Sequence, residues 1–237
     1  MVFMLSYKTL LVFVPTKEML FAGIFLGIHF ALFFRGVQLT SIAEASLLGT
    51  TAPIFTGIYG FIFQKNPLVP KVVFGLFLAF VGAGALVSQS SFSETGALGN
   101  ILALLSSIAI SYVLVAGKEI RKSFDVFEYT RWLFFFAAAT LFVISLFVNV
   151  SVFTISTTEF PWFVFLALVP TVIGHNIFYY LLKTLNTTTV AAVPLGEPVI
   201  SSVGALVFFG EPITAAIVFG GGITLFGVFL VVRFGDE

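Results

Sequence analysis

Cysteine is absent from the 237-residue chain, and charged residues are scarce. The lack of cysteine excludes disulfide bonds, thiolate metal sites and cysteine nucleophiles. The 11 basic and 11 acidic residues make up 9% of the chain, against roughly 25% in an ordinary soluble domain. The basic residues form no cluster of the kind that binds nucleic acid, so we expect no nucleic-acid partner.

Hydrophobic residues, by contrast, make up 59% of the chain, and its mean hydropathy is +1.14. A soluble domain of this size could not bury so much apolar surface. The composition therefore predicts an all-α integral membrane protein in contact with membrane lipids. It gives no sign of a cofactor, because the 32 phenylalanines suit lipid-facing and helix-packing surfaces.

Eight apolar segments follow one another along the chain, each near the ~20 residues that cross a bilayer core. They are Met19–Phe34, Ile42–Phe63, Val69–Val87, Ala97–Ala116, Trp132–Val150, Trp162–Leu182, Thr188–Phe209 and Ala215–Val232. Residues 1–14 are too short to span, and we interpret them as the stump of a further helix. The sequence thus predicts a bundle with eight transmembrane helices present.

Lysine and arginine are distributed unevenly between the two sides of these spans. One side holds Lys17, Lys65, Lys71, Lys118, Arg121, Lys122, Arg131, Lys183 and Arg233. The other holds only Arg35, which either attracts anionic substrate at that mouth or snorkels to headgroups. The positive-inside rule places the rich side and the C-terminus in the cytoplasm. We expect a multi-pass protein of the plasma membrane. Lys118, Arg121 and Lys122 are interpreted as determinants of this topology.

An acidic residue, Glu197, lies near the middle of the predicted span Thr188–Phe209, flanked by Pro194, Gly196 and Pro198. A charge at that depth costs a few kcal/mol or more, and such residues usually face a protein interior or a water-filled cavity. The prolines predict a break in the helix. The segment is therefore a candidate substrate or ion site, with a structural carboxyl group that stabilises the break as the alternative.

The segment His29–Val87 repeats as His175–Val232 when one gap is allowed near residue 45. Matched positions include His29 with His175, Pro53 with Pro198, Phe63 with Phe208, Gly75 with Gly220, Gly82 with Gly227 and Val87 with Val232. The first copy begins by leaving the cytoplasm and the second by entering it, so the copies have opposite topology. Inverted repeats are typical of secondary transporters, whose site lies near the midplane between the repeats.

The repeat predicts two more helices than the sequence contains. Two apolar segments precede the repeated part in the second copy, and the first copy should have two as well. We therefore expect an incomplete first repeat in residues 1–93 and a five-helix second repeat in residues 94–237. The expected parent is a ten-helix protein of two five-helix repeats. This chain would be a fragment, a late-start gene product or a shortened variant of it.

The end of the chain resembles the EamA-type transporters of the drug/metabolite transporter superfamily. The resemblance is carried by Leu185–Ala192, Pro198, the helix to Phe209, the turn Gly210-Glu211-Pro212 and the glycines Gly220–Gly222 and Gly227. The first copy is similar but has Asn66 where the turn usually has an acidic residue. The resemblance covers nearly the whole chain from Met19. It implies an inverted-repeat bundle that moves small metabolites by alternating access.

His29 and His175 occupy matched positions within predicted spans. They could relay protons or hydrogen-bond a substrate, because histidine titrates near physiological pH. The alternative is interhelical hydrogen bonding. Asn176 and Tyr179 follow, and Tyr179 shares a helix face with His175 that either lines a cavity or packs. Without acidic neighbours the histidines predict no metal site.

Thr50 and Thr51 stand just before Pro53, which matches Pro198 of the second copy and is likewise expected to break its helix. Their hydroxyls either face Glu197 across the pseudo-two-fold axis or bond to their own helix backbone. The first copy has Ala52 where the second has Glu197, so a site built here is asymmetric.

Glycine spacings indicate close helix contacts. Gly23-x-x-x-Gly27, the run from Gly75 through Ala79 to Ala83, and Gly220–Gly222 all permit close approach of a neighbouring helix. These glycine faces serve either helix packing within the chain or contact between two copies in a homodimer.

The favoured function is a secondary transporter that exports small metabolites, such as amino acids or related compounds. An intramembrane enzyme would need paired acids, a G-x-S-x-G motif or a His/Glu metal cluster within the spans. The aspartates, Asp125 and Asp236, are both in connections, so we expect no catalytic residues. No G-x-x-x-x-G-K-[ST] motif indicates an ATP-driven pump. A non-transporting membrane partner or a truncated inactive variant is the alternative.

Overall fold

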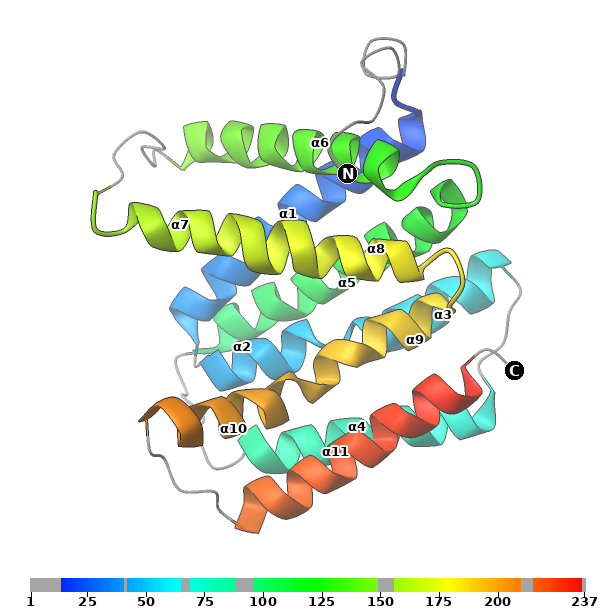
Figure 1. The fold of residues 1–237 in the computed structure, drawn as a ribbon, viewed down its shortest axis with the longest axis vertical. Helices are drawn as coiled ribbons and strands as arrows, with labels where there is room; N and C mark the ends of the chain where they lie inside the picture. The colour runs from blue at the N-terminus through cyan, green and yellow to red at the C-terminus, as the bar shows by residue number, and fades with distance from the viewer. Residues whose placement is uncertain are drawn as a thin grey trace.

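The computed structural model describes residues 14–40, 42–64, 69–87, 96–148, 156–209 and 215–235. All elements in these ranges are helical (Figure 1). They are α1 (Lys17–Leu39), α2 (Ile42–Gly49), α3 (Ala52–Gln64), α4 (Pro70–Val87), α5 (Ala97–Ile120), α6 (Val126–Phe147), α7 (Phe160–Leu166), the π-helical η2 (Ala167–His175), α8 (Asn176–Leu181), α9 (Thr187–Ala192), the 3-10 helical η3 (Val193–Gly196), α10 (Glu197–Phe209) and α11 (Ala215–Phe234). Residues 1–13, Lys65, Asn66 and the turn 210–212, on which several predictions rest, lie outside the described residues.

Each of the eight predicted segments coincides with one helix or with consecutive helices. Five stretches are long and apolar enough to cross a membrane: Lys17–Leu39, Glu44–Ile62, Ala97–Ile120, Val126–Phe147 and Phe160–Leu181. Two shorter apolar helices, Pro70–Ala85 and Val218–Phe234, accompany them, and the segment that contains Glu197 is divided into three. The described residues thus form a membrane helical bundle, while the count of eight spans stays a prediction.

Three of the segments change course near a proline. The second breaks at Thr50 and Thr51, so that Pro53 falls in the first turn of α3. The segment after α8 changes to a 3-10 helix around Pro194 before α10 begins. The sixth segment was expected as one regular helix, but its middle is π-helical around Pro170. A proline lacks the N–H for a regular helical bond, which accounts for these positions.

Small residues bring three pairs of helices into close contact, two of them at glycine spacings singled out in the sequence. A Cβ atom added at Gly23 would lie 2.9 Å from Leu133 O of α6, and one at Gly27 2.8 Å from Ala137 O. α1 meets α5 in the same way, because a Cβ at Gly36 would lie 3.0 Å from Gly99 O. Larger residues at these positions would push the helix axes apart.

The tightest of these contacts joins α4 to α11, which run side by side at one edge of the bundle (Figure 1). A Cβ at Gly82 would lie 2.5 Å from Gly220 O, and one at Gly75 would lie 2.9 Å from Gly227 O. The two helices therefore meet backbone to backbone, which only glycine allows at these distances.

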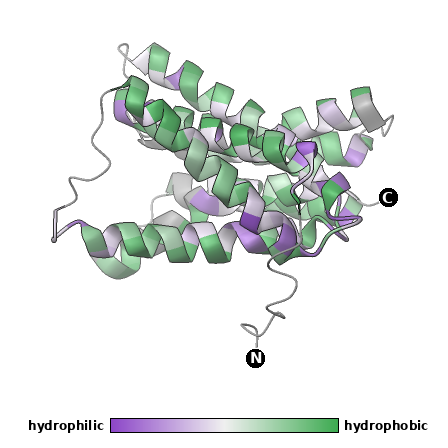
Figure 2. Cartoon of the chain, turned by 90° about the horizontal axis from the view of Figure 1, so that it is seen from above, coloured by the Kyte–Doolittle hydropathy of each residue, from purple (hydrophilic) through white to green (hydrophobic). Residues whose placement is uncertain are grey.

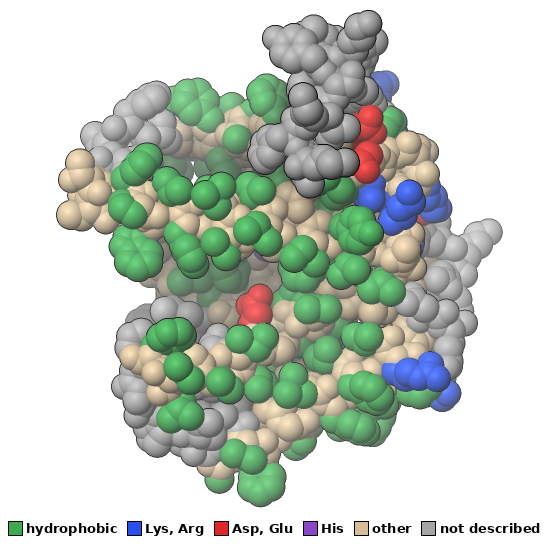
Figure 3. Space-filling model, in the orientation of Figure 1, with side chains coloured by type: hydrophobic (Ala, Val, Ile, Leu, Met, Phe, Trp, Pro, Cys, Tyr) green, Lys and Arg blue, Asp and Glu red, His purple; other side chains and the backbone are tan. Residues whose placement is uncertain are grey.

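Charged side chains gather at one end of the bundle. Lys118 lies near the end of α5, Lys183 follows α8, and Arg233 lies near the end of α11. The blue side chains of Figure 3 lie along one edge of the molecule, and Figure 2 shows hydrophilic residues gathered toward the end where the C-terminus lies. We call this end, defined by these three residues, the basic end.

Replacement of Gly227 by alanine should destabilise the α4–α11 contact. The added Cβ would meet Ala79 N and would lie 2.5 Å from Gly75 O, both backbone atoms that cannot move aside alone. We expect the free energy of unfolding to fall by about 1–3 kcal/mol, as for other overpacked cores. Circular dichroism of denaturant unfolding in detergent micelles measures this change.

Gly222→Ala, on the same helix, is the matched control because no atom lies within 4 Å of the added methyl group. It should leave stability unchanged or raise it by up to about 1 kcal/mol, since alanine favours helix more than glycine does. Equal effects of the two substitutions would contradict the proposed backbone contact.

Candidate functional site

Glu197 stands where the 3-10 turn η3 gives way to α10. Its side chain is exposed, so burial in the protein interior, one of the two expectations, is wrong for this arrangement. Among the described residues no hydrogen bond or ion pair reaches its carboxylate. Leu195 and Gly196, immediately before it, are buried against α11 and α4. The packed turn thus holds the carboxylate at the surface of a largely apolar molecule.

The face shown in Figure 3 gives the setting of this part of the chain. Most of that face is hydrophobic, and it is hollowed on the side away from the blue lysine and arginine edge. Isolated acidic atoms are visible near its middle. Inside a bilayer, such a hollow would have to hold water or a ligand wherever a charge faces it.

His29 and His175, predicted as a pair, both contact one aromatic ring, that of Phe30. The ring of Phe30 lies 5.2 Å from the His29 ring and 5.5 Å from the His175 ring, centroid to centroid. α1 carries Phe30 and His29, and η2 carries His175. The structure therefore brings the two matched positions of the repeat together in one cluster.

Each histidine has its Nδ1 atom beside a backbone carbonyl. Nδ1 of His29 lies 2.9 Å from Ser106 O of α5, and Nδ1 of His175 lies 2.9 Å from Pro170 O in its own π-helical stretch. Because a carbonyl oxygen only accepts, each Nδ1 must carry the hydrogen, and Nε2 is then the acceptor of the neutral ring. Interhelical hydrogen bonding, one expected role, is present for His29. A proton relay stays a prediction.

Tyr179 and Asn176 continue this cluster toward the basic end. Tyr179 is fully buried, and its ring lies 6.2 Å from the His175 ring and 5.5 Å from the Tyr129 ring, edge to face. Asn176 donates through Nδ2 to Val172 O, 2.5 Å away. Of the two expectations for this helix face, the packing of Tyr179 is the one seen.

Several polar atoms in this region lack a partner among the described residues. They are Asn176 Oδ1, Tyr179 Oη, Tyr129 Oη and, on α6, Trp132 Nε1. An unsatisfied buried polar group costs about 1–3 kcal/mol, so proteins rarely retain several together without a use for them. Tyr129 and Trp132 were missed from the sequence, where they stand among aromatic residues that suit lipid contact.

Thr50 and Thr51 follow the second alternative predicted for them. Thr50 Oγ1 donates to Leu47 O at 3.0 Å and Thr51 Oγ1 to Leu48 O at 2.6 Å, each on its own helix. These bonds add side-chain donors to carbonyls at the break, where Leu48 O also accepts from the N–H of Thr51. Thr51 also reaches across to α5, where its Oγ1 lies 2.6 Å from Ser107 Oγ.

Further buried hydroxyls on neighbouring helices complete this polar layer. Ser111 Oγ, one turn after Ser107, donates to Ala52 O at 3.1 Å. Thr56 Oγ1 of α3 donates to Thr188 Oγ1 of α9 at 3.2 Å, which joins the two broken segments directly. Sequence analysis missed these residues, although two serines one turn apart in an apolar span are a usable signal.

Two cations that were interpreted only as determinants of topology also make specific contacts within the protein. Arg121 is only 2% exposed, and its Nε donates to Tyr179 O at 3.2 Å while Nη1 donates to Phe124 O. Lys118 Nζ donates to Leu185 O at 2.8 Å. By contrast Arg35 is exposed and donates to Gln38 Oε1 on its own helix.

The chemistry of this site follows from these groups. It offers one exposed carboxylate, two imidazoles and a buried layer of hydroxyls beside two helix breaks. No group of three or more His, Cys, Asp or Glu side chains suitable for a metal ion lies within the described part of the chain. Such a set of groups can bind an ammonium group, donate and accept hydrogen bonds, and take up or release protons.

Comparison with known proteins gives a consistent answer. The sequence profile described as the EamA-like transporter family matches residues 2–88 and 97–233. The chain is 26% identical over 208 residues to an uncharacterized transporter of Archaeoglobus fulgidus, covering 85% of this chain and 70% of that protein. It is also 26% identical over 218 residues to the uncharacterized transporter YyaM of Bacillus subtilis, covering 87% and 72% respectively.

The fold has a counterpart among solved structures. One crystal structure aligns over 97% of this chain and 91% of its own, with a TM-score of 0.71. At 15% sequence identity this likeness concerns the fold alone.

Removal of the Tyr179 hydroxyl should cost no stability. In Tyr179→Phe an unpartnered buried oxygen disappears while the ring contacts remain, so we expect the free energy of unfolding to stay unchanged or rise by up to about 1 kcal/mol. Thr56→Val, which removes a partnered hydroxyl of similar burial, should lower it by about 1 kcal/mol. Denaturant unfolding in micelles measures both, and a clear loss for Tyr179→Phe would mean that its hydroxyl has a partner.

Proposed function

The chain belongs to the EamA-like transporter family, and from this premise we propose that it is a secondary transporter that exports small metabolites by alternating access. It is a multi-pass membrane protein of a transporter family. The proposal adds that the solutes are amino acids or related amines, that the basic end and the C-terminus face the cytoplasm, and that the protein resides in the plasma membrane.

The exposed carboxylate of Glu197 at a helix break is the observation that carries this proposal. Transporters of several folds place their sites at broken helices, where free backbone groups and an intramembrane charge can meet a solute. An unpaired carboxylate in apolar surroundings favours a cationic group, because the attraction is weakly screened there. A solute with an ammonium group and an apolar remainder matches both the charge and the hydrophobic walls.

The same carboxylate supplies a way to couple export to protons. A protonated carboxyl group no longer attracts an ammonium group, so proton and solute compete for Glu197. If only one of them is bound as the site changes sides, outward movement of solute is exchanged for inward movement of a proton. In this proposal His29 and His175, whose Nε2 is an acceptor in the neutral ring, take up and pass on the proton.

Two inverted repeats, residues 1–93 and 94–237, form part of the proposal, and the α4–α11 contact supports them. Under the predicted alignment Gly75 matches Gly220 and Gly82 matches Gly227. The close contacts run crosswise, from Gly75 to Gly227 and from Gly82 to Gly220. Reciprocal contact of this kind is what a two-fold axis produces.

Replacement of Glu197 by glutamine should abolish the pH dependence of transport and lower its rate at least tenfold. The amide keeps the size of the side chain but can neither ionise nor bind an ammonium group by charge. Proteoliposomes preloaded with a mixture of amino acids and small amines, with a proton gradient imposed, allow efflux of each solute to be followed by mass spectrometry.

Glu159→Gln, which changes an exposed carboxylate just before α7, is the control and should transport normally. Unchanged flux and unchanged pH dependence in Glu197→Gln would assign that residue a structural role. If the unaltered protein moves no solute in the screen, the result supports the alternative, a non-transporting membrane partner.

A further inference from the structure

Burial along the helices differs sharply between the two ends of the bundle. Every residue from Ser156 to Pro170, which includes α7, is exposed, whereas Tyr179 and Leu182 further along the same segment are fully buried. The next segment shows the same change from buried to exposed. Thr187 to Ala192 are all buried, whereas most described side chains of α10 are exposed. The helices thus close together at the basic end and separate at the other.

The closed end contains a continuous apolar core. Residues from α1, α5, α6, α8 and α9 meet there, including Met19, Leu26, Val113, Tyr129, Leu133, Tyr179, Leu182, Val190 and Ala191. Because Tyr129 and Tyr179 are both 0% exposed, no path reaches their unpartnered hydroxyls in this arrangement. Any solute that passes from the hollow to the basic end must separate these side chains.

Arg121 stabilises this closed end by binding the C-terminal part of a helix. The last carbonyls of a helix lack intrahelical partners, and cations are favoured there by the helix dipole. Arg121 Nε donates to Tyr179 O, one of the last carbonyls of α8, while the N–H of Lys183 bonds to Tyr180 O instead. The guanidinium of Arg121, directly after α5, thereby fixes the end of α8 beside the tyrosine pair.

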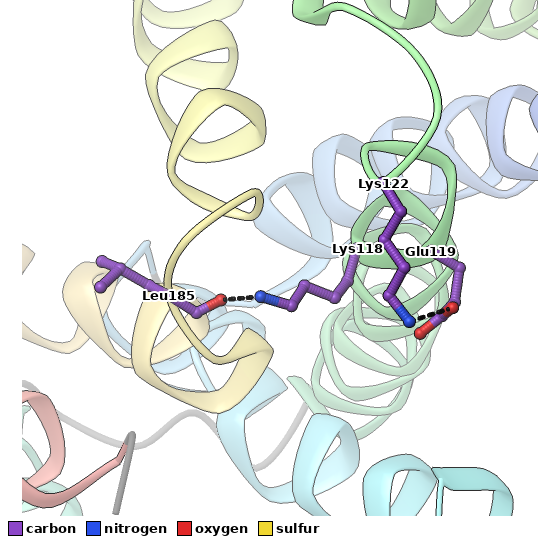
Figure 4. A network of polar contacts seen from close by, with 4 residues as sticks. All are labelled: Lys118, Glu119, Lys122 and Leu185. Carbon is purple, nitrogen blue, oxygen red and sulfur yellow. Dashed lines mark hydrogen bonds and ion pairs between the residues drawn. The ribbon is translucent and has the colours of Figure 1, made fainter.

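Lys118, one turn earlier on α5, holds the next part of the chain. Figure 4 shows its side chain extended from α5 to the connection between α8 and α9, where Nζ meets Leu185 O at 2.8 Å. The adjacent Lys122 instead turns back to Glu119 on its own helix. Lys118 therefore holds the connection between α8 and α9, while Arg121 holds the end of α8 just before it.

We propose that Lys118 and Arg121 are positioning residues that keep the basic end closed, and that solute crosses when the α8–α9 connection leaves them. This inference rests on the proposed transport function. Lys118 binds a neutral carbonyl in that connection and Arg121 binds one near the end of α8, just before it. Among the described residues no carboxylate pairs with Arg121. Bonds to neutral carbonyls can be exchanged for bonds to water at small net cost, which suits a contact that must break in each cycle.

The absence of cysteine from the chain makes a direct test possible, because a single introduced thiol is the only one to react. Ala191→Cys places it in the closed core on α9, at a position only 3% exposed, with little change in volume. The rate of its alkylation by a water-soluble maleimide, in proteoliposomes, reports how often the basic end opens. In the otherwise unaltered protein we expect slow labelling.

Lys118→Met in this background should raise the labelling rate about tenfold, since the closed arrangement loses a charge-assisted bond. Lys118→Arg, which can still donate to Leu185 O, should restore the slow rate. Lys122→Met removes a neighbouring exposed cation whose contact lies within its own helix, and labelling should stay unchanged. Arg121→Lys retains the charge with fewer donors and should give an intermediate rate.

Unchanged labelling in Lys118→Met and in Arg121→Lys would overturn the proposal, whatever the transport assay shows. Equal acceleration by Lys122→Met would do so too, because the effect would then follow from net charge. Circular dichroism of each variant separates opening from unfolding. Accelerated labelling without any solute flux would leave the closing role in place and count against the transport function alone.

Discussion

The lack of water inside a bilayer is the constraint on which this structure depends. Every backbone group that a broken helix leaves without a partner must be satisfied by the protein itself. The hydroxyls of Thr50 and Thr51 bind carbonyls of their own helix, Ser111 binds Ala52 O, and Arg121 binds Tyr179 O. Breaks are therefore possible only where α5 or the chain itself brings a donor to them. This places α5 at the centre of the polar arrangement, although its own helix is unbroken.

Rigid and adaptable contacts are separated in the bundle. Glycines bring α1 against α6 and α4 against α11 at distances that leave no room for adjustment. The segments that contain Pro170 and Pro194 change helix type instead, and they border the hollow face. A scaffold of close helix pairs thus surrounds two segments whose backbone has alternatives. That division is suited to a protein in which a site must become accessible from each side in turn.

The sequence predicted what depends on local pattern and missed what depends on neighbours. Apolar length identified the helices, prolines identified two of the breaks, and glycine spacing identified the close contacts. The π-helical stretch around Pro170 was missed, because a proline within an apolar run does not specify which helix type replaces the regular one. The burial of Arg121 was missed because it depends on α8 ending beside α5. Likewise the exposure of the Glu197 side chain was missed, because it depends on how the neighbouring helices are spaced around it.

The reciprocal contact of α4 with α11 has a consequence for how such a chain can arise. Gly75 meets Gly227 and Gly82 meets Gly220, so each helix offers the other the same surface. A surface that fits its own copy is what two identical subunits need in order to pair about a two-fold axis. Under the proposed inverted repeat, the contact corresponds to a dimer interface enclosed within a single polypeptide. The two copies of such a repeat are free to differ, so that one carries Glu197 while the other carries Ala52, an asymmetry that no pair of identical subunits could have.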